Sequence, residues 1–260
     1  MILAVANQKG GVGKTTTAVN LSACLADEHG FKVLLIDLDP QGYAGDALGV
    51  KLTEEVPTAY EVITGKRPPV PYRRSEKLHI WPGARDIDDL DVTYANKPRG
   101  HHLLREALAE EYDRYDVVVI DTPPSLHLPT LNALTAATPL LVPSAPGFLS
   151  IDGMSQLLRE ISEVRQYTNP DLDMLGVLLT QADSRTRLPE DTLDLIRDVF
   201  PDLCVLESVI PNAIALAEAP GFGQSIFEYR PKSKEADAYR DLTEEVLRLV
   251  QTADTTSEVS

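Results

Sequence analysis

A glycine-rich segment near the beginning of the chain limits the possible folds more than any other part of the sequence. It reads Asn7-Gln8-Lys9-Gly10-Gly11-Val12-Gly13-Lys14-Thr15-Thr16. An apolar run, Ile2 to Asn7, precedes it, and a helical pattern, Gly13 to Glu28, follows. Glycines let a backbone wrap closely around an anion, and the N-terminus of a helix adds a favourable dipole. A strand, a loop of this kind and a helix in that order predict a phosphate-binding loop.

The residue types in this loop predict how it would hold a nucleotide. We expect Lys14 to contact the β- and γ-phosphates and the Thr15 hydroxyl to bind Mg²⁺. Gln8 stands where the strict pattern has its first glycine. The alternative is a glycine-rich turn with incidental lysines, which the flanking elements and the Lys-Thr ending disfavour. The expected phosphate-binding residues are Lys9, Gly10, Gly11, Val12, Gly13, Lys14, Thr15 and Thr16.

Three aspartates at the ends of apolar runs are candidates to complete the site. Asp37 and Asp39 follow one run, and Asp121 ends another that reads DVVVID. Alternation along a strand predicts that Asp37 and Asp39 point to the same side, toward the phosphates. Asp121 is expected to hold Mg²⁺ through water. The alternatives are helix caps or turn acids before Pro40 for the first two and, for Asp121, an ordinary buried strand that ends in Asp.

Apolar β-branched runs alternate with helical patterns along the chain. The runs are 32–38, 116–121, 140–142, 174–179 and 205–210, and the helical patterns include 103–111, 150–167 and 189–200. Such alternation predicts a single α/β domain of the P-loop class, with a doubly wound, mostly parallel sheet that binds ligands at the strands' carboxyl ends. We expect residues 57–98, with a strand candidate at 79–81, to be surface elaboration. The domain would span 1–251, and the polar tail 252–260 would be disordered.

Composition adds limits on partners and location. The 40 acidic residues outnumber the 24 basic ones, giving a formal charge of -16 that disfavours tight wrapping by nucleic acid but permits a local basic patch. Cys24 and Cys204 are expected to be reduced and buried. The first residues lack the features of a signal peptide, and no apolar run reaches the ~20 residues that span a bilayer. We therefore expect no membrane partner.

These motifs resemble those of the ParA/MinD group of ATPases. The loop with its extra lysine, Lys9, is similar to the deviant Walker A motif, 36–42 to switch I, and 115–125 to switch II. Residues 1–250 resemble the ParA/Soj partition branch almost throughout, including the stretches 183–186, 209–211 and 216–223. Because the first predicted strand starts at Ile2, we expect no N-terminal helix-turn-helix domain.

The resemblance implies a chemistry and a set of roles. The cofactors would be ATP and Mg²⁺, and the activity slow ATP hydrolysis with Lys9, Lys14 and Asp39 as catalytic residues. Lys9 would reach the partner's phosphates across an ATP-dependent homodimer, and Asp39 would orient the attacking water. The metal residues would be Thr15, Asp37 (which would support either the metal or the loop) and Asp121. The base contacts would be Pro211 and Asn212, although Ala213 stands at the branch's asparagine position and Asn212 lies one residue before it.

The same resemblance implies partition of a chromosome, a plasmid or another cargo in the cytoplasm, in association with the nucleoid. A ParB-like protein would stimulate hydrolysis. Nonspecific DNA binding would use Arg230, Lys232, Lys234 and Arg240, with Arg185 and Arg187 as second candidates. The branch pattern I-P-R-N-V-R is Ile-Pro-Asn-Ala-Ile-Ala at 210–215, without its arginines, and Gly147 stands at a position that is acidic in the branch.

Two other functions remain open at this point. The first is a MinD-like positioning ATPase at a membrane. Against it, the last helical pattern has an apolar face typical of a docked helix and an acidic face that anionic lipid would repel. These faces are Tyr239, Leu242, Val246 and Leu249, and Asp237, Asp241, Glu244 and Glu245. The second is a metabolic P-loop enzyme, such as a ligase, with a substrate site in 57–98.

Overall fold

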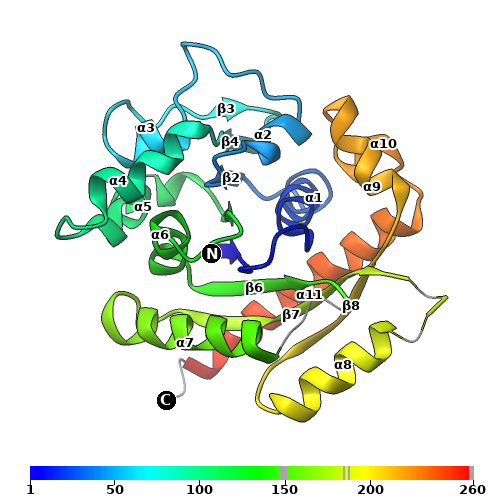
Figure 1. Ribbon diagram of the computed structural model, residues 1–260. Coiled ribbons are helices and arrows are strands. Elements are labelled where there is room, and N and C mark those ends of the chain that lie inside the picture. The colour runs from blue at the N-terminus through cyan, green and yellow to red at the C-terminus, as the bar shows by residue number, and fades with distance from the viewer. Residues whose placement is uncertain (110, 147–150, 184, 187, 258–260) are drawn as a thin grey trace.

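The computed structural model describes residues 1–260 except 110, 147–150, 184, 187 and 258–260. The described residues form one sheet, in the order β3-β4-β2-β5-β1-β6-β7-β8 (Figure 1). Its strands are β1 (Ile2–Val5), β2 (Val33–Asp37), β3 (Tyr72–Arg73), β4 (Leu78–Trp81), β5 (Val117–Asp121), β6 (Pro139–Ser144), β7 (Asp173–Ala182) and β8 (Val205–Pro211).

Helices connect these strands and cover both faces of the sheet. They are α1 (Lys14–Asp27), α2 (Tyr43–Ala47), α3 (Ala59–Ile63), α4 (Asp89–Tyr94), α5 (Leu103–Ala109), α6 (Leu128–Ala136), α7 (Ile151–Tyr167), α8 (Leu188–Val199), α9 (Ile214–Glu218), α10 (Ile226–Tyr229) and α11 (Lys234–Ser257). Short 3₁₀ turns occur at Arg85–Asp88, Gly100–His102, Tyr112–Arg114 and Ala219–Phe222.

All strand pairs are parallel except that of β3 with β4, which confirms the predicted doubly wound α/β class. The register places Asp37 of β2 opposite Asp121 of β5, and Asp121 opposite Val5 of β1. Parallel pairing brings the carboxyl ends of these strands to the same edge of the sheet. The phosphate loop and the predicted carboxylates therefore meet at one place.

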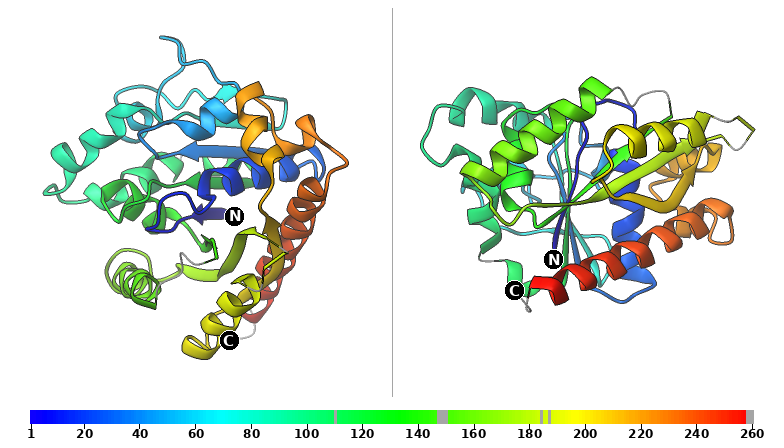
Figure 2. Two further views of the ribbon diagram at one scale, coloured as in Figure 1. Left: turned by 45° about the vertical axis from the view of Figure 1, so that its right-hand side comes forward. Right: turned by 90° about the horizontal axis from the view of Figure 1, so that it is seen from below.

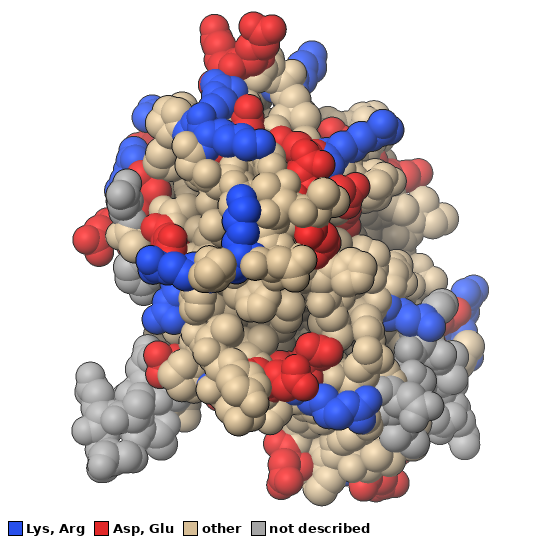
Figure 3. Space-filling model, turned by 60° about the vertical axis from the view of Figure 1, so that its left-hand side comes forward, with Lys and Arg blue, Asp and Glu red and all other residues tan. Residues whose placement is uncertain are grey.

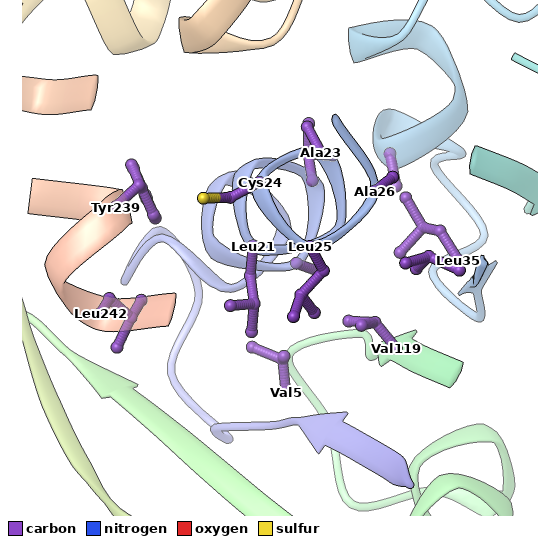
Figure 4. Packing of buried hydrophobic residues seen from close by; sticks show 14 of the residues in the cluster. Val5, Leu21, Ala23, Cys24, Leu25, Ala26, Leu35, Val119, Tyr239 and Leu242 are labelled. Atoms are coloured by element: carbon purple, nitrogen blue, oxygen red, sulfur yellow. The ribbon is translucent and has the colours of Figure 1, made fainter. Parts of the chain in front are cut away.

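Two apolar layers hold this edge in position. One face packs on α1, α10 and α11, and the other on α3 to α7. In Figure 4, Leu21 and Leu25 of α1 point toward Val5 and Val119 of the sheet, and Cys24 points toward Tyr239. Leu21, Leu25 and Val5 are fully buried, so α1, which begins at the loop, has little freedom to shift.

The prediction that residues 57–98 are surface elaboration is wrong. Strand β4 lies between β3 and β2 in the sheet, and every residue of its sequence Leu78-His79-Ile80-Trp81 is buried. Tyr60 and Ile63 of α3 pack in the same core as Trp81. The strand has only four residues among proline-rich segments, so its apolar run was too short to indicate a buried position.

The C-terminal helix also differs from the prediction. Helix α11 continues to Ser257, so the expected disordered tail is wrong for 252–257, and 258–260 lie outside the described residues. A helix that is already nucleated propagates at small cost per residue, even through a polar sequence. Figure 2 shows α11 running along one side of the molecule, where it packs against α1 and β8.

The predicted docking of α11 is confirmed, with one exception. Tyr239, Leu242 and Val246 are fully buried. Glu245, expected on the solvent face, is buried because its carboxylate accepts hydrogen bonds from the backbone N–H groups of Glu207 (2.7 Å) and Ser208 (2.9 Å) in β8. No helix in the described ranges has both the length and the apolar character needed to cross a membrane.

The two cysteines have different surroundings. Cys24 is buried as predicted, and the burial raises the pKa of its thiol to about 11. Cys204 is exposed, so the prediction that it is buried is wrong. Partial burial of its sulfur still raises the pKa of the Cys204 thiol. Neither thiol is therefore poised as a thiolate near neutral pH.

We expect Leu242→Ala to lower the free energy of unfolding by ~2–5 kcal/mol, because it removes a fully buried side chain between α11 and the sheet. Urea denaturation followed by circular dichroism measures this. Val92→Ala is the control, since Val92 is 86% exposed and its truncation should change stability by less than ~0.5 kcal/mol. Equal effects of the two changes would contradict the docking of α11 on the core.

Candidate functional site

The glycine-rich loop connects the end of β1 to the start of α1. Gly11 and Gly13 have φ values of +72° and +83°, in the left-handed region that favours glycine. Gly13 is also the N-cap of α1, so the turn into the helix requires this residue type. Lys14 is the first residue of α1. The loop therefore ends at a helix N-terminus, the arrangement predicted for phosphate binding.

Contacts with strands β6 and β7 support the loop. The Asn7 amide donates a hydrogen bond to the Pro143 carbonyl (2.7 Å) and accepts one from the Lys9 backbone N–H (3.0 Å). The Thr180 hydroxyl donates to the Val12 carbonyl (2.8 Å). Pro143 and Thr180 belong to β6 and β7. The sequence did not identify the contacts with Pro143 and Thr180, because each connects residues more than 100 positions apart.

Lys14 lies at the centre of the site. Its side chain is buried, and Nζ donates to the Lys9 carbonyl at 3.0 Å. Burial lowers the pKa of the Lys14 ammonium, while the carboxylates of Asp121 and Asp39 act in the opposite direction. An anion bound in the loop would stabilise the charged lysine further, which is the role predicted for this residue.

Asp121 ends β5 as a buried acid. The residue is fully buried, and neither carboxylate oxygen has a hydrogen-bond partner of acceptable geometry among the described residues. Burial raises its pKa, the charge of Asp37 raises it further, and Thr15 and Lys14 oppose the rise. Leaving a carboxylate in this state is costly unless a cation compensates it.

This acid fits the predicted magnesium site. In the described part of the chain, no three His, Cys, Asp or Glu side chains form a metal-binding cluster. Mg²⁺ commonly uses one or two protein ligands together with waters and substrate phosphates, so it does not need such a cluster. Asp121, with the neighbouring Thr15 hydroxyl, supplies groups of the right chemistry.

Asp37 has a different environment from Asp121. One of its oxygens accepts from the Asp39 N–H (2.9 Å), and the other accepts from the N–H groups of Ala44 (3.0 Å) and Gly45 (3.4 Å). Burial raises the pKa of Asp37 to about 7, although these hydrogen bonds lower it. Of the two roles expected for Asp37, these contacts favour support of the loop over support of the metal.

Asp39 reaches the site from a turn, because β2 ends at Asp37. The two acids therefore do not alternate along one strand, contrary to the prediction. Asp39 still lines the cavity described next, whereas Asp37 does not. Its Oδ1 accepts from the Gln41 N–H at 2.9 Å, which holds the side chain in the turn.

A cavity of about 640 Å³ opens over the loop. Its walls include Gly10, Gly11, Gly13, Lys14, Thr15, Thr16, Asp39, Pro124 and Gln181. Lys9 is exposed and does not line this cavity. The two lysines thus differ in position. Lys14 lines the cavity, whereas Lys9 is exposed outside it.

A second cavity of about 310 Å³ adjoins the first. Pro211 and Asn212, the predicted base contacts, both line it, and so does Tyr239 of α11. Gly13, Thr16 and Gln181 line both cavities. No sequence motif identified Gln181 or Tyr239 as site residues, because they come from the end of β7 and from the C-terminal helix.

The basic residues predicted to bind DNA differ in their surroundings. The Arg240 guanidinium donates to both oxygens of Glu28 (2.7 and 2.6 Å) and to Asp237 (2.8 Å), which gives it a structural role that competes with a DNA contact. Arg230 pairs with Glu218 at 3.6 Å. Lys232 and Lys234 are exposed.

Of the second candidates for DNA binding, only Arg185 lies within the described residues. Arg185 pairs with Asp183 at 2.8 Å, while Arg187 and Gly147 lie outside the described residues. Figure 3 shows the side of the molecule that lies to the left in Figure 1, where basic and acidic side chains are interleaved. On that side no extended basic patch is visible among the coloured residues.

Comparisons with known proteins agree with this geometry. Residues 1–174 match the family described as "AAA domain". The chain is 43% identical over 251 residues to the chromosome-partitioning ATPase Soj of Thermus thermophilus, covering 96% of this chain and 97% of that protein. It is 40% identical over 253 residues to the chromosome partitioning protein ParA of Myxococcus xanthus, covering 95% and 88%.

A solved structure also resembles the chain over nearly its whole length. It is described as a cobyrinic acid a,c-diamide synthase from Mycobacterium smegmatis with bound ADP and magnesium. The TM-score is 0.85 at 38% identity, with 97% of this chain and 96% of that chain covered.

The turn that carries Asp39 depends on a close backbone approach. A Cβ on Gly83 would lie 2.6 Å from the Asp39 carbonyl oxygen and 2.8 Å from Cγ of Asp37. We therefore expect Gly83→Ala to displace this turn and to destabilise the protein by about 1–3 kcal/mol. Gly221→Ala is the matched control, because nothing lies within 4 Å of the added Cβ. Thermal unfolding measures both, and unchanged stability of Gly83→Ala would refute the packing of this turn.

Proposed function

The chain belongs to the ParA/Soj family of partition ATPases, and on that premise we propose that it is an ATP-driven dimerisation switch that acts in DNA segregation. The observation that carries this proposal is the different exposure of two lysines of one loop. Lys14 is buried in the site, whereas Lys9 is exposed and lies outside the cavity wall. In a monomer, the Lys9 side chain does not line the cavity in which the phosphates of the same subunit would bind. It suits a group that acts on a second subunit.

The nucleotide step follows from the groups around the loop. As an ATP hydrolase, the protein would bind the triphosphate on the loop backbone and Lys14, with Thr15 and Asp121 holding Mg²⁺. The metal would supply charge neutralisation at the phosphates. Asp39, held in its turn by the Gln41 N–H, would orient the attacking water. Asp37 would keep that turn in place through the N–H groups it accepts from.

Dimerisation would couple nucleotide state to assembly. Two loops that face each other bring two triphosphates close together, and their charges repel unless cations lie between them. An exposed lysine at the head of each loop can supply these cations only when the subunits meet. ATP would therefore favour the dimer, and hydrolysis would release it.

DNA binding would be weak and electrostatic. The formal charge of -16 opposes binding, and Arg230 and Arg240 already have carboxylate partners. Dimerisation would double whatever positive surface Lys232 and Lys234 provide. A ParB-like protein would stimulate hydrolysis and release the dimers from the nucleoid.

A second candidate function comes from the Mycobacterium smegmatis structure: an ATP-dependent amidating ligase. A ligase that takes nitrogen from glutamine commonly needs a reactive thiolate. Burial raises the thiol pKa of both Cys24 and Cys204, which disfavours thiolate formation. The partition function has the stronger support in this chain, because the chromosome-partitioning proteins of Thermus thermophilus and Myxococcus xanthus are 43% and 40% identical to it over nearly its whole length.

We expect Asp39→Ala to accumulate as an ATP-bound dimer, because the nucleotide would bind without productive orientation of water. Light scattering after size exclusion, with Mg²⁺ and ATP, measures the mass. Lys14→Ala should stay monomeric, since it loses the buried cation of the phosphate site. Lys9→Ala should bind ATP yet remain monomeric. A monomeric Asp39→Ala with ATP bound, or a Lys9→Ala dimer, would contradict the switch.

We expect the ATP-bound dimer to shift DNA of arbitrary sequence at low salt and to lose affinity steeply as salt rises, because phosphate contacts release counterions. Lys232→Ala combined with Lys234→Ala should weaken the shift, whereas Lys51→Ala, at an exposed lysine outside the candidate set, should not. Electrophoretic mobility with Asp39→Ala protein and ATP measures this. Absence of any shift at low salt would remove DNA from the proposal.

The same preparations separate the two candidate functions. A partition ATPase should hydrolyse ATP faster when DNA and a ParB-like protein are added. An amidating ligase should instead respond to cobyrinic acid with glutamine or ammonia. If only cobyrinic acid with glutamine or ammonia increased ATP hydrolysis, the ligase function would be supported and the partition function contradicted.

A further inference from the structure

Gln181 has a backbone conformation that few side chains tolerate. It lies near the end of β7 with φ at +53°, one of two non-glycine residues with positive φ in the described parts of the chain. Such a conformation is strained and persists only where the surroundings hold it. Strained positions of this kind cluster at functional sites.

The side chain of Gln181 is attached to the phosphate loop. Its amide Nε2 donates a hydrogen bond to the carbonyl oxygen of Gly11. The preceding residue, Thr180, donates to the carbonyl of Val12 at 2.8 Å. Two successive residues of β7 thus fix two successive residues of the loop, and the unusual backbone at Gln181 turns its amide toward the site.

Gln181 lies at the boundary between two cavities, where it could contact a ligand that occupies both. Among the described residues, Gly13, Thr16 and Gln181 alone line both the cavity over the loop and the cavity at Pro211 and Asn212. On the proposed function, the phosphates occupy the first cavity and the base the second. The ribose must then cross the boundary that these three residues form.

Of these three residues, Gln181 is best suited to contact a sugar. Gly13 has no side chain, and Thr16 belongs to the phosphate-binding loop. A glutamine amide offers two donors and an acceptor, which match the mixed character of ribose hydroxyls. Gln181 is also exposed, so its amide can turn from Gly11 toward a ligand.

We propose that Gln181 hydrogen-bonds a ribose hydroxyl of the bound nucleotide and so sets the preference of this site for ribonucleotides. This inference rests on the proposed nucleotide binding and adds a specificity residue to it. A hydrogen bond of this kind is worth about 0.5–1.5 kcal/mol, or roughly 2- to 12-fold in affinity.

The test compares the dissociation constants of four ligands in the presence of Mg²⁺: ATP, its 2′-deoxy and 3′-deoxy analogues, and inorganic tripolyphosphate. We expect the protein to bind ATP roughly 2- to 12-fold more tightly than at least one of the deoxy analogues. Gln181→Ala should reduce that ratio to about 1 while tripolyphosphate binding stays within about 2-fold. Gln181→Gly should give the same loss of preference without the backbone strain.

Gln224→Ala is the matched control, because Gln224 is a partly buried glutamine that lines neither cavity. It should keep the full preference for ribose. A ratio that survives in both Gln181 variants would overturn the inference, as would equal affinity of the unaltered protein for ATP and both deoxy analogues. Equal weakening of ATP, deoxy analogues and tripolyphosphate by Gln181→Ala would show that Gln181 only braces the loop. If neither ATP nor tripolyphosphate binds the unaltered protein, the proposed function itself fails.

Discussion

The site depends on the pairing of β2 with β5, which brings two buried acids together at the ends of neighbouring strands. Asp37 lies opposite Asp121 in the register, and the buried Lys14 faces the same region from the loop. Two carboxylates in a buried position repel each other and lose hydration. Asp37 is stabilised by three backbone N–H groups, whereas Asp121 has no comparable partner. The fold therefore creates a position that a cation would stabilise.

The loop that completes this position is held by elements far from it in sequence. Asn7, Thr180 and Gln181 fix its backbone through contacts to β6 and from β7. On the other side of the site, Gly83 allows the turn of Asp39 to approach the end of β4 closely. Preorganisation of this kind means that little ordering remains to be done when a ligand binds.

The surface is less distinctive than the site. The ion pairs of Arg230 and Arg240 compete with contacts to DNA, and the net charge is strongly negative. Helix α11 uses its apolar face to pack on α1 and the sheet, so that face is not available to a membrane. The phosphate site is thus formed by buried residues such as Lys14 and Asp121. The proposed contacts with DNA would instead use a few exposed side chains, and their combined charge would depend on dimerisation.

The sequence by itself determined the α/β class, the position of the phosphate loop, and Lys14, Asp39 and Asp121 as the residues to look for. Those features are local. Glycines before a helix and acids at the ends of apolar runs can be recognised from neighbouring residues alone, without knowledge of distant contacts. Only the tertiary structure decided that β4 lies inside the sheet, that Asp37 holds a turn, and that Gln181 stands between two cavities. These depend on contacts between residues far apart in the chain, and a short strand or a single glutamine carries no local pattern that would reveal them.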